Sequence, residues 1–426
     1  MEKSDTKHVV VIGAGFGGLN AVKALCAFKH LKITLIDKTN HHLFQPLLYQ
    51  VATAALSPAD IAIPIREIFR NQTNVSTLMG TVIEINKQAK FVTLENQQQI
   101  SFDYLIVSVG SRHAYFGKPE WEQDAPGLKT LEDALKIRNK ILMSFEIAER
   151  MEESLQRQSY MTFVVIGGGP TGIEMAGAIA EIAHQSLKRN FRNIDPTHTK
   201  ILLVEGGSQV LMGYPENYAK IAQHDLEKMG VIVRLNSRVT QISEAGIHIG
   251  DEYIDAKNVI WAAGNEASRL HQSLQTPLDK QGRVIVGSDL SLPEDSNIFV
   301  IGDGAHTVDE KGAVLAAVAP VAVQQGRYVA KIIGKKLTKD KRSPFRYVDK
   351  GMMATIGKYK ALVLSGPVRC SGFFAWLMWC FVHIYFLIGY RTKLFVFSQW
   401  AFYFFHGQRN IRLIIKPSQG ERHEDD

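Results

Sequence analysis

The chain contains little cysteine, which limits the chemistry it can carry. Only Cys26, Cys370 and Cys380 occur among 426 residues, and no two of them are spaced as C-x-x-C. This usage argues against a disulfide framework and against a zinc site, so we expect no metal.

An apolar leader is also missing, and acidic residues are scarce towards the other end. Residues 1–7 are short and polar, so we expect the bulk of the chain to fold in the cytoplasm. Between Arg346 and Gly420 there are ten Lys or Arg residues and a single acid, Asp349. Aromatic residues in this basic segment form nearly continuous apolar runs, which suits an anionic lipid surface better than a nucleic acid. We therefore predict no nucleic-acid partner.

Two glycine-rich turns, each leaving an apolar strand and opening a helix, are the most informative feature of the sequence. The first is Gly13–Gly18 (GAGFGG) after the strand His8–Ile12, and the second is Gly167–Gly172 (GGGPTG) after Phe163–Ile166. Each has the G-x-G-x-x-G spacing that lets backbone amides approach a pyrophosphate at a helix N-terminus. Two such turns predict two bound dinucleotides and an enzyme that passes electrons between them.

An acidic residue ends the strand after each glycine turn. Asp37 ends the first of these strands and Glu205 the second, where a carboxylate can bind the ribose hydroxyls of the adenosine half. A carboxylate at this place repels the 2′-phosphate of NADPH, and Gly206 and Gly207 follow Glu205, so no basic residue stands immediately beside it. We therefore predict NADH at the second turn.

Strands and helices alternate around the glycine turns, which is typical of an α/β fold with doubly wound parallel sheets. We expect helices at 19–28, 131–158 and 172–190, and strands at 75–85, 91–94, 104–109, 231–234, 239–242, 259–263 and 298–301. Turns after Val107 and Trp261 are where the chain could cross between domains. We predict two Rossmann-like domains, the second inserted in the first, plus a C-terminal appendage. We predict that residues 1–120 and 285–344 form the first domain and that residues 121–284 form the inserted second domain. Residues 345–426 form the predicted C-terminal appendage.

Asp303 lies in a Gly-Asp-Gly-Ala turn after an apolar strand, at the start of a predicted helix. Its carboxylate could accept a hydrogen bond from a ribityl hydroxyl, or it could simply cap the helix. With Asp37 upstream, we favour contact with a flavin.

In this order, the elements resemble the two-dinucleotide-binding-domain flavoproteins. The match is closest to type II, non-proton-pumping NADH:quinone oxidoreductases, over almost the whole chain, and its most specific stretch is 40–52 (NHHLFQPLLYQVA). The resemblance implies FAD in the first domain and NADH in the second. The residues implied on the FAD side are Gly13, Gly15, Gly18, Asp37, Gln45, Gly110, Gly302, Asp303 and Ala319. Those implied on the NADH side are Gly167, Gly169, Gly172, Glu205 and Gly264.

Disulfide reductases of the same superfamily carry a redox-active cysteine pair after the first ribose acid, and residues 38–70 here contain no cysteine. Sulfide:quinone oxidoreductases need paired cysteines near the flavin, which this chain also lacks. Thiol chemistry is therefore not expected, and the hydride must leave the flavin for another acceptor.

Three residues are candidates for catalysis. Glu174 lies in the first turn of the second nucleotide helix, where an acid complements the helix dipole. The resemblance implies instead a proton-handling or positioning role near the nicotinamide and flavin, which we favour. Residues 318–326 resemble the family's quinone-contacting helix and supply Gln324 and Gln325. Pro320 stands where the family often has glutamine, so one polar contact to the quinone head group is in question.

Two apolar, aromatic runs lie near the C-terminus, at 373–390 and 394–405. The first just reaches the length of a membrane span. Because both are rich in aromatic residues and flanked by cations, we expect helices that lie in the membrane interface, as the resemblance also implies. An ordinary buried core helix is the alternative.

Together these patterns predict a peripheral membrane flavoenzyme on the cytoplasmic face of the cell membrane. It would oxidise NADH and reduce ubiquinone or menaquinone without pumping protons, and we expect a homodimer. One rival is a soluble NADH-dependent ferredoxin or rubredoxin reductase, against which the apolar tail argues. Another is a membrane-tethered redox sensor that binds NADH and flavin without useful turnover, for which Pro320 is the only hint.

Overall fold

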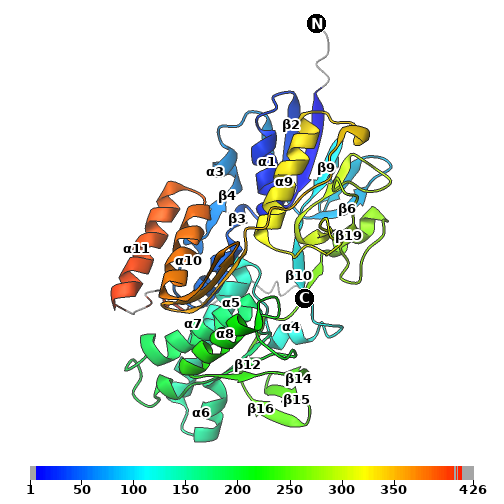
Figure 1. Cartoon of the computed structure of the whole chain (residues 1–426). Coiled ribbons are helices and arrows are strands. Elements are labelled where there is room, and N and C mark those ends of the chain that lie inside the picture. Colours follow the sequence, from blue (N-terminus) through cyan, green and yellow to red (C-terminus); the bar gives the residue numbers. More distant parts are fainter. Residues whose placement is uncertain (1–5, 407–408, 410, 415–426) are drawn as a thin grey trace, which may run out of the picture. The chain divides into compact units, whose positions relative to one another are not determined.

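The computed structural model describes residues 6–406, 409 and 411–414 (Figure 1). Tertiary contacts divide the chain into two compact units, each built from three segments. The first unit comprises 1–43, 62–114 and 265–350, and the second comprises 44–61, 115–264 and 351–426. The predicted crossings after Val107 and Trp261 lie close to two of these boundaries, and the C-terminal segment is grouped with the second unit.

The first unit is built on a five-stranded sheet in the order β20-β9-β1-β2-β5, and all its neighbouring strands are parallel. These strands are β1 (Lys7–Ile12), β2 (Leu31–Asp37), β5 (Val75–Met79), β9 (Tyr104–Val107) and β20 (Ile298–Val300). The central strands are nearly continuous runs of buried Val, Ile and Leu, as expected for a sheet covered on both faces.

Two helices of the first unit, α1 (Phe16–Leu25) and α9 (Ala319–Gly334), lie side by side (Figure 1). They approach so closely that a Cβ placed on Gly326 would lie 2.3 Å from the Gly17 carbonyl oxygen. The rest of this unit consists of short elements. These are β3 (His41–Leu43), β4 (Ala62–Pro64), α3 (Ile65–Phe69), β6 (Val82–Asn86), β7 (Phe91–Leu94), β8 (Gln99–Ser101), β10 (Ser111–His113), β18 (Asn265–Ala267), β19 (Val284–Ile285), β21 (Ala305–His306) and 3-10 turns at 269–274, 302–304 and 339–341.

The helix predicted to start at Asp303 is wrong. Residues Gly302–Gly304 form one 3-10 turn, the strand β21 follows at once, and the helix α9 begins only at Ala319. The carboxylate of Asp303 is instead held by Ser111, whose hydroxyl donates to it over 2.7 Å.

The second unit repeats the plan with a four-stranded parallel sheet in the order β13-β12-β11-β17. Its strands are β11 (Thr162–Ile166), β12 (Lys200–Val204), β13 (Val231–Arg234) and β17 (Asn258–Trp261). The helices around it are α4 (Trp121–Asp124), α5 (Leu131–Arg150), α6 (Ser154–Tyr160), α7 (Pro170–Glu181) and α8 (Glu216–Lys228). An antiparallel meander of β14 (Val239–Ser243), β15 (Gly246–Ile249) and β16 (Glu252–Asp255) completes this part.

Two helix predictions for the second unit had different outcomes. The long helix after the second glycine turn is confirmed, because α7 continues into a π-helical turn at Ile182–Ser186. The single helix predicted over 131–158 is wrong: Met151 adopts an extended conformation, and the chain forms α5 and α6 instead.

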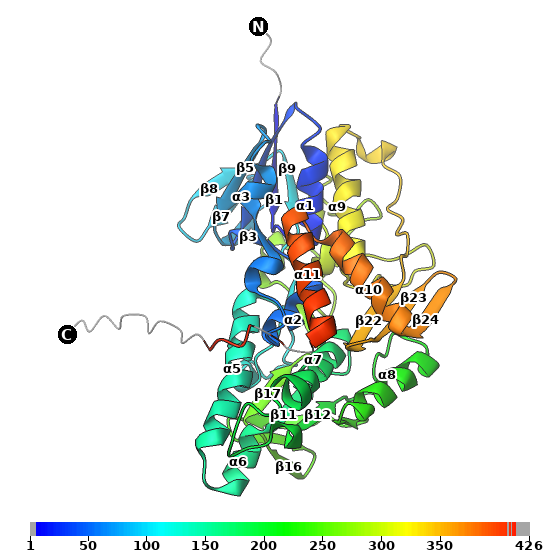
Figure 2. The ribbon, with the colours of Figure 1, turned by 90° about the vertical axis from the view of Figure 1, so that its left-hand side faces the viewer.

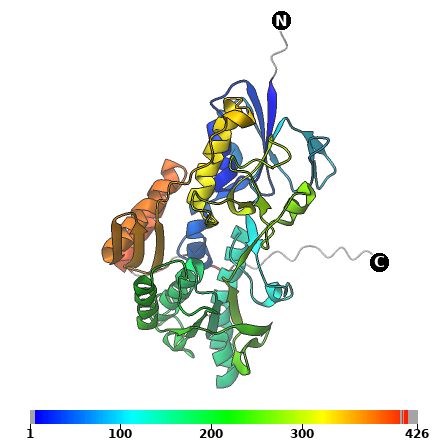
Figure 3. The same cartoon turned by 45° about the vertical axis from the view of Figure 1, so that its right-hand side comes forward.

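The C-terminal part of the second unit contains a sheet that the sequence did not predict. The strands β22 (Met352–Gly357), β23 (Lys360–Ser365) and β24 (Val368–Gly372) form an antiparallel meander that packs on α7 and α10. Figure 3 shows this sheet beside the two last helices. Gly177 of α7 permits the close contact, since a Cβ there would lie 2.1 Å from the carbonyl oxygen of Ile356.

The two apolar runs form the helices α10 (Phe373–Phe386) and α11 (Tyr390–His406), which lie side by side (Figure 2). Gly389, with φ +83°, makes the turn between them. The 3-10 turn at 58–60 lies against α11. The short helix α2 (Leu48–Ala52), which follows a 3-10 turn at 45–47, is joined to α11 by a hydrogen bond from Trp400 to Gln50. Within the described ranges, no helix has both the length and the apolar character to cross a membrane.

Candidate functional site

The first glycine turn is shaped by backbone packing, with an opening at its middle residue. Gly13 has φ +94°, and a Cβ on Gly18 would lie 1.9 Å from the Gly13 carbonyl oxygen, so neither position accepts a side chain. Around Gly15, by contrast, no described atom lies within 4 Å of a Cβ position. This space at the N-terminus of α1 is where a pyrophosphate can meet free backbone N–H groups.

The second turn has the same three features: a first glycine with positive φ, a third glycine in close contact with the first, and open space at the second glycine. Gly167 has φ +109°, a Cβ on Gly172 would lie 1.8 Å from the Gly167 carbonyl oxygen, and the space around Gly169 is free of described atoms within 4 Å. Each unit therefore offers one dinucleotide cradle at the N-terminus of a helix.

The two acids at the strand ends also hold their glycine turns in place. Asp37 accepts a hydrogen bond from the backbone N–H of Ala14 over 2.6 Å. Glu205 accepts from the N–H of Gly168 over 2.5 Å and, with its other oxygen, from the N–H of Gly207 over 2.7 Å. Both carboxylates are thus fixed at the edge of a cradle, where the ribose of a dinucleotide would lie.

Three predicted glycines, Gly110, Gly264 and Gly302, share one conformation, with φ +72° at each. Gly110 and Gly302 follow the neighbouring strands β9 and β20 of the first unit, and Gly264 follows β17 in the second. A residue with a side chain would be strained at all three positions.

Gln325, one of the two glutamines predicted to contact quinone, is buried and holds the turn around Asp303. Its side-chain oxygen accepts from the N–H of Gly302 over 2.6 Å, and its amide nitrogen donates to the Thr307 hydroxyl over 3.1 Å. The amide of Gln324 makes a reciprocal pair with the backbone of Val348, with distances of 2.9 and 3.0 Å. Both head groups are engaged by the chain itself, and contact with a quinone stays a prediction.

The other two predicted residues outside the cradles lie at element starts. Ala319 is the first residue of α9. Gln45 opens the 3-10 turn at 45–47, and its amide nitrogen donates to the carbonyl of Lys129 over 3.0 Å, within the second unit.

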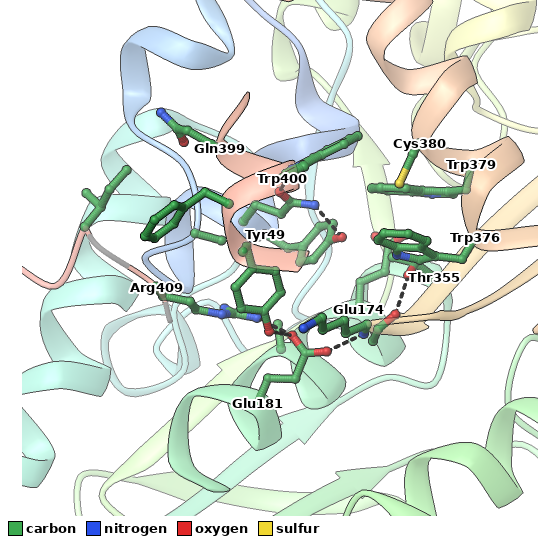
Figure 4. Close-up of a pocket in the computed structure, with 18 of the residues that line it drawn as sticks. Tyr49, Glu174, Glu181, Thr355, Trp376, Trp379, Cys380, Gln399, Trp400 and Arg409 are labelled. Carbon is green, nitrogen blue, oxygen red and sulfur yellow. Dashed lines mark hydrogen bonds and ion pairs between the residues drawn. The ribbon is translucent and has the colours of Figure 1, made fainter. Parts of the chain in front are cut away.

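The second unit contains a cavity of about 440 Å³ between α2, α7, the β22–β23 turn and the helices α10 and α11 (Figure 4). Aromatic side chains make up much of its wall, and Glu174 and Glu181 of α7 reach it. The lining residues used below are Tyr49, Gln50, Glu174, Glu181, Thr355, Lys358, Trp379, Cys380, Trp400, Tyr403 and Arg409.

Glu174 is a neutral acid in this cavity. Burial raises the pKa of its carboxyl to about 8, and the backbone N–H of Thr355, which donates to it, offsets this only in part (Figure 4). Its side chain keeps some accessible surface because it borders the cavity, yet no cation pairs with it among the described residues. At neutral pH this carboxyl carries a proton that it can give to a bound molecule.

Glu181, two turns along the same face of α7, is paired with a cation instead. It forms a buried ion pair of 2.6 Å with Arg409 and accepts from the Tyr403 hydroxyl over 2.9 Å and from the backbone N–H of Lys358. Burial alone would lower the pKa of the Arg409 guanidinium, but Tyr403 and Glu181 outweigh it and raise that pKa. Arg409 also donates to the carbonyl of Thr53 over 2.6 Å, so it joins three segments.

A chain of hydrogen bonds runs along another wall of the cavity. The Trp400 indole donates to Gln50 over 2.8 Å, and the Gln50 amide donates to the Tyr49 hydroxyl over 2.9 Å. Burial raises the pKa of Tyr49 well above its usual range, so the phenol keeps its proton and can donate it. The buried Trp379 indole N–H has no acceptor within the described part of the chain.

Cys380 also lines the cavity, and burial raises the pKa of its thiol to about 12. A neutral thiol is a poor nucleophile, so Cys380 is not suited to attack a substrate.

Sequence reasoning found Glu174 but missed the residues around it, because they come from five separate segments. One signal was available: Glu181 follows Glu174 by seven residues and must share its helix face. The tryptophans and Arg409 were read only as parts of a membrane-facing tail.

Comparisons with known proteins agree on one family. Residues 7–326 match the family described as pyridine nucleotide-disulphide oxidoreductase. The chain is 41% identical to the type II NADH:quinone oxidoreductase Ndh of Mycobacterium tuberculosis, covering 97% of this chain and 91% of that protein. It is also 41% identical to NdhA of the same organism, over 93% of this chain and 87% of that one. Among solved structures, NDH2 from Plasmodium falciparum in complex with NADH has the same fold, with a TM-score of 0.86 at 20% identity, covering 96% of this chain and 100% of that one.

Proposed function

The chain belongs to the type II NADH:quinone oxidoreductase family, within the pyridine nucleotide-disulphide oxidoreductase superfamily, and we propose how its residues serve that reaction. The enzyme oxidises NADH and reduces a quinone. The balance is NADH, one proton and quinone going to NAD⁺ and quinol, so a proton from the medium must reach the reduced quinone.

The first unit is the proposed FAD-binding unit. The open position at Gly15, the fixed carboxylate of Asp37 and the Asp303 turn held by Ser111 and Gln325 suit the pyrophosphate, ribose and ribityl groups of FAD. When bound, FAD supplies the two-electron chemistry that links a hydride donor to a quinone.

The second unit is the proposed NADH-binding unit. Its cradle at Gly169 offers the N-terminus of α7 to the pyrophosphate, and Glu205 is fixed where it can accept hydrogen bonds from the adenosine ribose.

The cavity of the second unit is the proposed quinone site, and the neutral carboxyl of Glu174 is the observation that carries this proposal. The aromatic wall suits an apolar, planar ring. Glu174, Tyr49 and the N–H of Trp379, which has no acceptor among the described residues, are donors for its carbonyl oxygens. Glu174 would hold the proton that the reduced quinone oxygen takes up. Gln324 and Gln325 remain proposed contacts on the flavin side.

The helices α10 and α11 are the proposed membrane-attaching element. Their exposed aromatic side chains include Phe374, Phe381, Tyr390 and Phe405, which are 75%, 71%, 82% and 79% exposed. Such a surface favours the acyl boundary of a bilayer, where the substrate quinone dissolves. We propose peripheral attachment on the cytoplasmic face and a homodimer.

Stopped-flow kinetics of the two half-reactions test the quinone site. Glu174→Gln should leave reduction of the enzyme by NADH within about twofold and slow its reoxidation by a short-chain quinone at least about tenfold. Reoxidation by a one-electron acceptor such as ferricyanide, which needs no proton, is the control. Unchanged quinone reoxidation in the variant would contradict the proposed role of Glu174.

A further inference from the structure

A positive charge lies beside the strand-end acid of the second cradle, although none is adjacent to it in the sequence. A Cβ placed on Gly206 would lie 3.3 Å from Cγ and 3.7 Å from Nε of Arg238. The expectation that no basic residue accompanies Glu205 therefore holds only along the chain, not in space.

Backbone hydrogen bonds fix Arg238 in this place. After β13, the N–H of Asn236 donates to the carbonyl of Gly207 over 2.8 Å, and the N–H of Ser237 donates to the carbonyl of Glu205 over 2.9 Å. Asn236 has φ +51°, a left-handed conformation that Asn tolerates and that turns the chain back along the Glu205 loop. Arg238 is thus held beside Gly206 by the course of the backbone.

The charge of Arg238 is available to a ligand. Its side chain is exposed, and its guanidinium has neither an ion pair nor a hydrogen bond among the described residues. Arg234, four residues earlier, is by contrast neutralised by Glu252 at 2.6 Å. Glu205 accepts from two backbone N–H groups and is not paired with Arg238.

We propose that Arg238 forms a subsite for the 2′-phosphate of NADPH, so that this enzyme also oxidises NADPH as a second, weaker substrate. The proposal rests on the proposed binding of NADH at the second cradle. A guanidinium binds a phosphate through two parallel hydrogen bonds, and Gly206 and Gly207 present no side chain to block the approach. The reaction is otherwise unchanged: NADPH, one proton and quinone give NADP⁺ and quinol, with the phosphate untouched.

Two opposite charges then set the preference between the cofactors. Glu205 favours the 2′-hydroxyl of NADH and repels a phosphate, whereas Arg238 attracts the phosphate and does little for the hydroxyl. NADH remains preferred because the Glu205 carboxylate is bonded directly to the glycine turn at Gly168.

Steady-state kinetics of the wild type and of three variants, Arg238→Gln, Glu205→Gln and Arg234→Gln, test the proposal. Arg238→Gln should lower kcat/KM for NADPH about tenfold, mainly through KM, and change that for NADH less than about twofold. Glu205→Gln should raise kcat/KM for NADPH. The matched control, Arg234→Gln, removes a nearby but paired cation and should leave the ratio of the two cofactors unchanged. Equal losses for NADH and NADPH in Arg238→Gln, or no loss for NADPH, would overturn the proposal.

Calorimetric binding gives a readout that needs neither hydride transfer nor quinone. The FAD-loaded enzyme is titrated with adenosine 2′,5′-bisphosphate and with 5′-AMP. The ratio of the two affinities measures what the 2′-phosphate alone contributes to binding. The ratio of the two affinities should fall about tenfold in Arg238→Gln, should be partly kept in Arg238→Lys, and should shrink with added salt. An affinity ratio independent of Arg238 would refute the subsite. If the subsite is present but the enzyme reduces no quinone, the proposed function and the oxidation of NADPH by quinone both fall, whereas the 2′-phosphate subsite at Arg238 stands.

Discussion

The two glycine turns are nearly identical, but the helices that follow them are not. Both first glycines have strongly positive φ, both third glycines touch the carbonyl oxygen of the first, and both middle glycines are open. Counting from the first glycine, Glu174 corresponds to Asn20 and Glu181 to Ala27. Asn20 donates to the carbonyl of Phe16 in its own helix, whereas both acids of α7 reach a cavity.

This difference shows that dinucleotide binding and acid chemistry depend on different parts of the chain. The cradle depends on backbone geometry and tolerates almost any sequence after it, so the chain can use it twice. Acid chemistry depends on which side chain the next helix turns inward, and α7 turns two carboxyls towards aromatic walls. In the first unit, the corresponding helix α1 packs on α9 through the close contact of Gly17 with Gly326, and Asn20 bonds back to its own helix.

The glycine turns give the largest expected effects. Gly18→Ala and Gly172→Ala would force a Cβ to within 2 Å of a carbonyl oxygen, so each should lower the free energy of unfolding by more than about 4 kcal/mol. In Gly15→Ala and Gly169→Ala the added methyl group enters open space, and φ at both positions suits alanine. These variants should change the free energy of unfolding by less than about 1 kcal/mol. Denaturant unfolding measures both pairs.

The same open-position variants separate the two cradles. Gly15→Ala should lose bound FAD, seen as lost flavin absorbance, while Gly169→Ala should keep FAD and raise KM for NADH. The assignment of the cofactors to the units would be reversed if Gly169→Ala lost the flavin.

The buried pair of Glu181 and Arg409, which borders the cavity of the second unit, should matter next most. Arg409→Ala leaves Glu181 buried without a cation and should lower the free energy of unfolding by about 3–5 kcal/mol. Arg412→Ala, which removes one partly buried hydrogen bond to the carbonyl of Ser186, is the control and should cost about 1 kcal/mol. The double variant Glu181→Gln, Arg409→Met should recover part of the loss, and an equal or larger loss would contradict the pair's assignment.

The pH dependence of stability tests the raised pKa of the Glu174 carboxyl, a group that the first glycine helix lacks. Because the folded pKa of Glu174, about 8, lies above its unfolded value of 4.5, the folded state binds the extra proton between these values. Stability should therefore be fully present below about pH 4.5 and fall as pH rises towards 8, with a slope of at most about 1.4 kcal/mol per pH unit. Glu174→Gln should remove this slope in urea unfolding from pH 5 to pH 8. A wild-type slope that persists in Glu174→Gln would mean that another group titrates.

The sequence predicted the features that depend on local spacing. Glycine spacing, apolar strands and strand-end acids located both parallel sheets, and the apolar runs located α10 and α11. Features that depend on distant segments were missed: the β22–β24 sheet, the ion pair of Arg409 with Glu181, and the position of Arg238 beside Gly206. The helix predicted at Asp303 failed because an acid after a strand suits a 3-10 turn as well as a helix cap.

Substitutions on the exposed aromatic face of α10 and α11 should have the smallest effect per residue, and the effect is on membrane binding. A similarly exposed apolar residue of the first unit should not show it. Phe374 is 75% exposed in the second unit, and Met79 is 67% exposed in the first. If α10 inserts into the acyl boundary, Phe374→Gln should weaken partitioning onto vesicles containing anionic lipid by about 1 kcal/mol, or about fivefold. Met79→Gln, which exchanges a similarly exposed apolar side chain, should have no effect in the same sedimentation assay.

Salt then separates apolar insertion from charge attraction on this face. Basic residues such as Arg391 and Lys393 flank the aromatic side chains, and their attraction to anionic lipid is screened at high ionic strength. Burial of aromatic surface is not screened, so the wild type should stay bound in 1 M salt, with the loss from Phe374→Gln undiminished. Complete release by salt, or equal losses for Phe374→Gln and Met79→Gln, would show that charge alone attaches the protein and that the aromatic face serves another contact.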